Sequence, residues 1–178
     1  MAELILVRHG QTDWNRDRRY QGHADPPLND AGRAEAHELA GSLEGMELAA
    51  IYTSDLRRAA ETAEIIHAGR DIPLRRERGL REIDVGSWSG LTRAEIEERF
   101  PGAEHHDGET REAMRERVVG TVTAIARRHD SERLLIVSHG GALRALLHHA
   151  LQDDSVPLVE NCAIYRLAFR DGVLRGID

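Results

Sequence analysis

The sequence predicts an α/β fold of the doubly wound type, a three-layer α/β/α sandwich whose central sheet is mostly parallel. Short apolar runs, as expected of strands buried on both faces, alternate along the chain with longer segments of helical period. No linker, repeat or change in composition interrupts the 178 residues. We therefore expect one domain that spans residues 1–178.

The first half of the chain contains two strand-helix pairs. Residues 4–7 are continuously apolar and predict a buried strand, and a helix is expected from the capping residue Asn29 to a stop at Gly45. Residues 49–52 predict the second strand. The Thr-Ser-Asp sequence that follows is a helix cap, and the helix is expected to run to about His67.

The second half begins with an irregular, glycine-containing stretch between Leu74 and Gly90, and regular patterns then resume. Apolar spacing, caps and the helix-breaking Pro101 set the expected bounds. The expected elements are a strand at 74–76, helices at 92–99 and 109–128, a strand at 134–137, a helix at 141–151 and a strand at 162–169 that leads to a turn at Asp171-Gly172.

The composition excludes several classes of protein. All 24 basic residues are arginine, so chemistry that needs a lysine, such as a P-loop or a Schiff base, is ruled out. The formal net charge of -7 disfavours nucleic acid and anionic membranes as partners. The single cysteine, Cys162, excludes internal disulfides and is expected in the core. The sequence contains no apolar run long enough for a membrane span, so we expect a cytoplasmic protein.

Histidines and arginines gather where the expected strands end. Arg8 and His9 follow the first strand, His139 follows the strand at 134–137, and Arg57 lies just beyond the second strand. In a doubly wound sheet, ligands bind at the carboxyl ends of the strands. The sequence therefore predicts a site with two histidines and two arginines at one edge of the sheet.

These residue types suit phosphoryl transfer. Arginine binds an oxyanion through two parallel N–H groups, and two arginines can supply the positive charge that magnesium brings to other sites. A neutral imidazole is a competent nucleophile, and a second, protonated one can stabilise the transferred group. Gly140 and Gly141 open a helix, where free N–H groups also favour an anion. We expect neither a metal nor a cofactor.

Other basic and metal-ligating residue types have simpler interpretations. Neighbouring histidines such as His105 and His106 point apart on a helix or strand and have no metal-ligand spacing. A further group of arginines lies in charge-rich segments, and we expect these side chains to be solvated and without chemistry. The group consists of Arg16, Arg18, Arg19, Arg75, Arg76, Arg127 and Arg128.

The residues at these strand ends resemble the histidine phosphatase superfamily, the phosphoglycerate mutase-like proteins. The N-terminal LVRHGQTDWN resembles the signature in which the histidine is phosphorylated, and further segments match in order along nearly the whole chain. They are Ser54-Asp55-Leu56-Arg57-Arg58-Ala59, Leu80-Arg81-Glu82-Ile83, Gly86-Ser87-Trp88-Ser89-Gly90 and Ser138-His139-Gly140-Gly141.

The resemblance implies a role for each of these positions. His9 would be the nucleophile, Glu82 the proton donor to the leaving group, and His139 would stabilise the phosphoryl group. Arg8 and Arg57 would bind that group. The other positions implied in phosphate or substrate binding are Asn15, Gln21, Gly22 and Gly140.

The resemblance is to the short phosphatase branch rather than to the longer phosphoglycerate mutases. Asp107-Gly108-Glu109-Thr110 resembles the Gly-Glu-Ser element of that branch, with Thr110 in place of the usual serine. The implied function is metal-independent hydrolysis of a small phosphorylated metabolite through phosphohistidine. A cofactor-dependent phosphoglycerate mutase and a non-catalytic module that binds phosphorylated ligands stay open as alternatives. The oligomeric state is open as well, with a homodimer among the choices.

Overall fold

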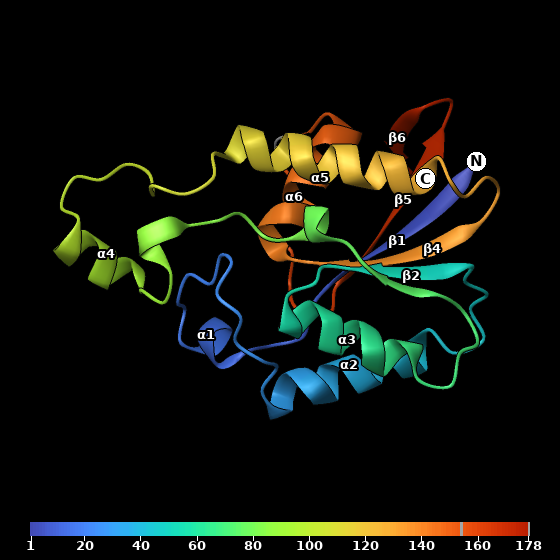
Figure 1. Ribbon diagram of the computed structural model, residues 1–178, viewed down its shortest axis with the longest axis horizontal. Coiled ribbons are helices and arrows are strands. Elements are labelled where there is room, and N and C mark those ends of the chain that lie inside the picture. The colour runs from blue at the N-terminus through green and yellow to red at the C-terminus, as the bar shows by residue number, and fades with distance from the viewer. Residues whose placement is uncertain (154, 178) are drawn as a thin grey trace.

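A six-stranded sheet forms the centre of the computed structural model, which describes residues 1–153 and 155–177 (Figure 1). The strands lie in the order β3-β2-β4-β1-β5-β6; β1 to β4 are parallel, and β5 and β6 are antiparallel to their neighbours. The strands are β1 (Ala2–Arg8), β2 (Ala50–Thr53), β3 (Leu74–Arg76), β4 (Arg133–Ser138), β5 (Ile164–Arg170) and β6 (Val173–Gly176).

Helices cover both faces of the sheet. In Figure 1, α2 and α3 lie below the sheet and α5 and α6 lie above it, so the predicted three-layer α/β/α class is confirmed. The helices are α1 (Asp13–Arg16), α2 (Asp30–Ser42), α3 (Arg57–His67), α4 (Arg93–Arg99), α5 (Arg111–Ala126) and α6 (Gly140–Leu151), with short 3₁₀ turns η1 (Arg78–Leu80) and η2 (Gly86–Trp88).

The alternation of side chains along the central strands divides the core into two clusters. In β1, Leu4 and Leu6 pack toward α5 and α6, whereas Ile5 and Val7 pack toward α2 and α3. Both sets are fully buried, which explains why residues 4–7 of β1 are apolar without interruption.

Each expected strand and helix is present, with ends that differ by a few residues. The predicted cap at Asn29 is confirmed, because its side chain accepts a hydrogen bond from the backbone N–H of Gly32. Four short elements were not predicted, because they have no clear sequence period: strand β6, helix α1 and the 3₁₀ turns η1 and η2. The expectation for Cys162 is corrected in part: the residue packs against the core and is partly buried, but its φ of 54° places it in a turn before β5 rather than in a strand.

Strand pairing determines where the polar strand ends meet. Arg8 pairs with Ser138 at the ends of β1 and β4, and Thr53 pairs with Val137 at the end of β2. The next residues of β1 and β4, His9 and His139, therefore emerge side by side. Helices α1 and α4 lie beyond this edge of the sheet (Figure 1).

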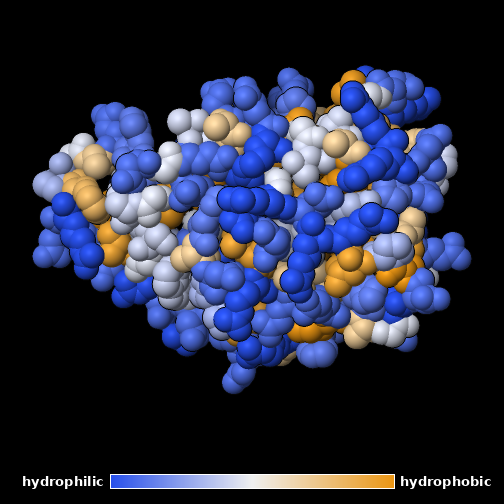
Figure 2. All heavy atoms as spheres, viewed as in Figure 1, coloured by the Kyte–Doolittle hydropathy of each residue, from blue (hydrophilic) through white to orange (hydrophobic). Residues whose placement is uncertain are grey.

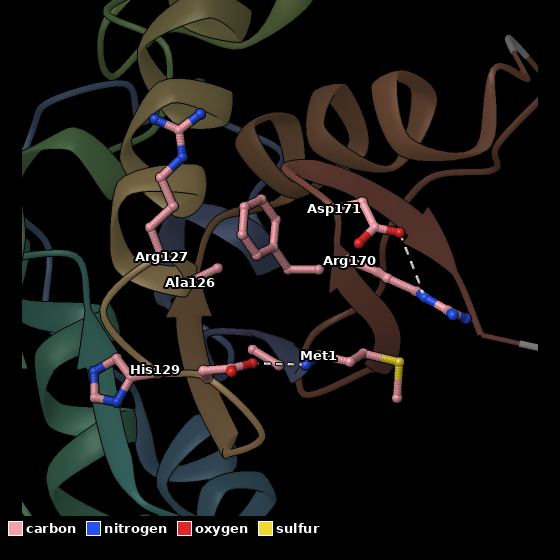
Figure 3. Close-up of a pocket in the computed structure, with 9 residues that line it drawn as sticks. Met1, Ala126, Arg127, His129, Arg170 and Asp171 are labelled. Atoms are coloured by element: carbon pink, nitrogen blue, oxygen red, sulfur yellow. Dashed lines mark hydrogen bonds and ion pairs between the residues drawn. The ribbon is translucent and has the colours of Figure 1, made fainter.

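The surface shows two further features. Figure 2 shows a face with mostly hydrophilic residues and small scattered groups of hydrophobic ones, and no helix in the described ranges is long and apolar enough to cross a membrane. A cavity of about 570 Å³ opens at the end of the sheet near the N-terminus (Figure 3). Its charges are largely paired, Met1 with Asp130 and Arg170 with Asp171, and no predicted site residue lines it.

Candidate active site

A smaller cavity, of about 260 Å³, lies at the carboxyl ends of β1 and β4 and brings most of the predicted site residues together. It is lined by Arg8, His9, Asn15, Arg19, Tyr20, Gln21, Gly22, Arg58, Glu82, Ile83, Val85 and Gly141.

His9 is held as a neutral imidazole with one nitrogen available. Its Nδ1–H donates to the carbonyl of Gly10 at 2.7 Å, and its Nε2 accepts from Nε of Arg58 at 3.2 Å. These bonds assign the proton to Nδ1 and the lone pair to Nε2. Burial, together with the charges of Arg58 and Arg8, holds the pKa of His9 well below its ordinary value. The arrangement suits a nucleophile.

His139 lies beside His9, with the ring centroids 5.1 Å apart and the planes at 62°. The side chain is fully buried, and neither ring nitrogen has a hydrogen-bond partner among the described residues. Burial, followed by the charge of Arg58, holds the pKa of His139 well below its ordinary value, so the expected protonated form is not the form of the free site. A bound dianion would raise this pKa, because its negative charge favours the imidazolium and offsets the charge of Arg58.

Three arginines line the cavity, and Arg8 and Arg58 are the two whose charges act on His9. Arg8 donates from Nη1 to the carbonyl of Val159 at 2.6 Å, and its buried Nε has no partner in the described part of the chain. Arg58 is 1 % exposed and holds the neighbouring loop through the carbonyls of Ala24 and Gly22. Burial lowers the pKa of Arg58 to about 10, which leaves it charged at neutral pH.

The predicted position of Arg57 at the site is wrong. Its side chain is exposed, and its backbone N–H donates to Asp25. Successive residues of a helix point about 100° apart, so only one of two adjacent arginines can face the cavity. A signal in the sequence was available: Arg58 is in phase with the buried Thr62 and Ile66, at steps of four residues.

This correction leads to a paired prediction. We expect Arg58→Lys to reduce phosphomonoester turnover by roughly 10²–10³-fold, because an ammonium loses the planar fork that binds an oxyanion. Arg57→Lys should leave turnover close to that of the parent protein. Steady-state rates of the two variants are to be compared at a temperature equally far below the melting temperature of each. Equal rates would remove the specific role from Arg58, and a loss confined to Arg57→Lys would return the role to Arg57.

Helix α1 and the loop after it contribute three of the predicted residues. Asn15 uses its side-chain oxygen to accept from the backbone of Thr12, which closes the first turn of α1. Gln21 has a buried side-chain oxygen without a partner among the described residues, and the Gly22 carbonyl accepts from Arg58. All three predicted residues line the cavity.

Glu82 occupies the anion site at the start of α6. Its carboxylate accepts from the backbone N–H groups of Gly141 at 2.9 Å, Ala142 at 3.0 Å and Ile83 at 2.9 Å. These helix N–H groups were expected to hold an exogenous anion, and in the structure they hold this carboxylate instead. Both oxygens of Glu82 are thereby fixed at the edge of the cavity.

Gly140 does not line the cavity, contrary to the prediction. A Cβ at this position would lie 3.3 Å from Nε of Arg8. Its contribution is to leave room for the Arg8 guanidinium, and the neighbouring Gly141 lines the cavity in its place.

Besides Arg58 and Gly141, four lining residues were not predicted. Tyr20, Ile83 and Val85 are uncharged and carry no catalytic signature. Arg19 is not simply solvated, because its Nη1 donates to the carbonyl of Gly90 and to Glu95, each at 2.7 Å. An isolated β-bridge joins Arg19 to Thr92, so only the folded contact between two distant segments identifies this residue.

The donors of this cavity are matched to an oxyanion rather than to a cation. Within residues 1–153 and 155–177, no group of three or more His, Cys, Asp or Glu side chains could hold a metal ion. Two charged guanidinium groups and a carboxylate already bound to backbone N–H groups surround His9.

Comparisons with known proteins find similarity along nearly the whole chain. The sequence profile of the histidine phosphatase superfamily (branch 1) matches residues 4–175. Phosphoglycerate mutase-like protein 4 of Arabidopsis thaliana is 37% identical over 164 residues, which cover 84% of this chain and 71% of that protein. The metal-independent phosphoserine phosphatase of the same plant is 34% identical over 185 residues, which cover 96% and 78%.

A solved structure shows the same fold. YhfR of Bacillus stearothermophilus superposes with a TM-score of 0.92 at 36% identity, and the match covers 99% of this chain and 95% of that one. The profile match, these two relatives and the shared architecture agree with the resemblance in the strand-end motifs. The chain therefore belongs to the histidine phosphatase superfamily.

Proposed function

We propose that the chain hydrolyses phosphomonoesters of small metabolites through a phosphohistidine at His9, without a metal ion. The observation that carries the proposal is the state of His9: a buried, neutral imidazole whose Nε2 lone pair accepts from the guanidinium of Arg58 and whose ring lies beside His139. The phosphoric monoester hydrolase class follows from the family and from the phosphatase among the relatives.

In the first step, the lone pair on Nε2 of His9 forms a bond to phosphorus, and the bond from phosphorus to the substrate oxygen breaks. The electron pair goes to the leaving oxygen, which takes a proton from Glu82. Arg8, Arg58 and His139 bind the oxygens of the transferred group. The proton on Nδ1 of His9 stays hydrogen-bonded to the carbonyl of Gly10.

In the second step, a water molecule attacks phosphorus, and the Glu82 carboxylate takes its proton. The P–N bond breaks, its electron pair returns to Nε2 of His9, and inorganic phosphate leaves. The enzyme regains the proton that it gave to the alcohol, so the two steps balance.

The two alternatives differ in what happens to the phosphohistidine. A mutase would return the phosphoryl group to a sugar-acid acceptor, whereas a binding module would form no phosphohistidine at all. The neutral nucleophile and the fixed carboxylate of Glu82 favour an enzyme, because a module that only binds phosphate needs neither. A cytoplasmic location and one domain over residues 1–178 are part of the same proposal.

We expect p-nitrophenyl phosphate to be turned over equally well with and without EDTA, and vanadate to inhibit. Two arginines supply the charge that a metal would otherwise provide, and with His139 they bind the five-coordinate geometry that vanadate imitates. The measurement is the steady-state rate after dialysis against chelator. Restoration of activity only by a divalent cation would contradict the metal-free site, and binding of phosphate without turnover would favour the binding module.

A further inference from the structure

Arg117, on α5, contacts the loop that carries Glu82 and has no role in the two reaction steps. Its guanidinium donates to the backbone carbonyls of Gly79 at 3.0 Å, Arg81 at 2.9 Å and Glu82 at 3.2 Å. It also donates to the two carboxylate oxygens of Glu109, at 2.8 and 2.6 Å. A guanidinium has five N–H groups, so each is used and none is left for a substrate.

Glu109 holds the same loop from its other end. Its backbone N–H donates to the carbonyl of Asp84 at 2.8 Å. The preceding Gly108 makes this approach possible, because a Cβ there would lie 2.2 Å from the same carbonyl oxygen. Burial opposes the charged form of Glu109, but the hydrogen bonds and charge of Arg117 outweigh it and hold the pKa of Glu109 below its ordinary value. The pair is therefore ionised at neutral pH.

The Glu82 segment is thus held on two sides. The carboxylate binds the N-terminus of α6, and the backbone carbonyl accepts from Arg117 and from Nε2 of His23, the latter at 2.8 Å. We infer that Arg117 and Glu109 are positioning residues for Glu82, which hold its carboxyl group where it can protonate the leaving oxygen. The inference rests on the proposed role of Glu82 as the proton donor.

The chemistry of arginine explains why this position needs it. The three carbonyls and the carboxylate approach the planar group from different directions, and a lysine has three donors on a single nitrogen. Arg117→Lys keeps the charge but must release some of these partners. A displacement of a catalytic group by about 1 Å is enough to slow a reaction by roughly 10²-fold.

The test compares two leaving groups in the first turnover, with enzyme in excess, so that hydrolysis of the phosphohistidine does not limit the rate. Arg117→Lys should slow release of an alkyl alcohol by roughly 10- to 100-fold and release of nitrophenolate much less, because nitrophenolate leaves without a proton. Arg133→Lys is the matched control. Arg133 pairs with Glu3 at the other end of the sheet, and this change should alter neither rate.

A double-mutant cycle separates positioning from a general effect on the fold. If Arg117 acts through Glu82, Arg117→Lys should cause no further loss on the alkyl phosphate once Glu82→Gln is present. Losses that multiply, or equal losses for both leaving groups, would overturn the inference. Glu109→Gln is measured in the same cycle, and it decides the question if the lysine variant does not fold.

The two proposals can fail separately. Equal losses for the two leaving groups in Glu82→Gln alone would remove Glu82 as the acid and, with it, the basis for a positioning role. A selective loss in Glu82→Gln combined with no selective loss in Arg117→Lys or Glu109→Gln would leave the proposed reaction intact and refute the positioning role alone.

Discussion

His9→Ala is expected to abolish both turnover and the covalent phosphate. Removal of a covalent nucleophile typically costs on the order of 10⁴-fold or more in rate, and His139, the imidazole beside His9, is proposed to bind the phosphoryl oxygens rather than to attack phosphorus. Brief incubation with labelled substrate, followed by quenching in base, should leave an acid-labile phosphate on the parent protein and none on the variant.

Two controls make this result specific. His37 is exposed on α2, and His37→Ala should keep both the label and the rate. His9→Asn retains a polar side chain in the buried position, which separates loss of the nucleophile from loss of stability. Persistence of the label in either His9 variant would remove His9 from the covalent step.

Glu82→Gln is expected to have the second largest effect, and the effect should depend on the leaving group. Loss of a general acid typically costs ~10²–10⁴-fold, and an alkyl phosphate should show the whole loss in the first turnover. Nitrophenolate leaves without a proton, so p-nitrophenyl phosphate should lose much less. The glutamine preserves the size of the side chain and an oxygen that can accept from the N-terminus of α6.

Asp84 provides the control for this comparison, because its carboxylate lies two residues after Glu82 in the chain and is roughly half exposed. Asp84→Asn should show no preference between the leaving groups. If Asp84→Asn instead shows the selective loss, the proton comes from that carboxylate.

The elements of the fold were predictable because their signals are local. Continuous apolar runs marked β1 and β4, a capping residue marked the start of α2, and Pro101 marked the end of α4. Strand β6 was missed, because four residues with one buried side chain carry no period. The turn at Cys162 was missed because its residues alternate as those of a strand do.

The sequence by itself determined which residue types reach the catalytic edge from the strands. Arg8, His9 and His139 follow directly from the strand ends, since parallel strands with paired registers deliver their next residues to one place. Composition likewise excluded lysine chemistry and internal disulfides, which no arrangement in space could restore.

Only the tertiary structure decided the choice between neighbours and the contacts between distant segments. The rotation of α3 places Arg58 rather than Arg57 in the cavity, and the close approach of α6 to Arg8 leaves little room for a side chain at Gly140. Arg117 reaches Glu82 from a position 35 residues away. Local patterns report the period of a helix, but the direction that each side chain faces depends on packing against segments that are remote in the sequence.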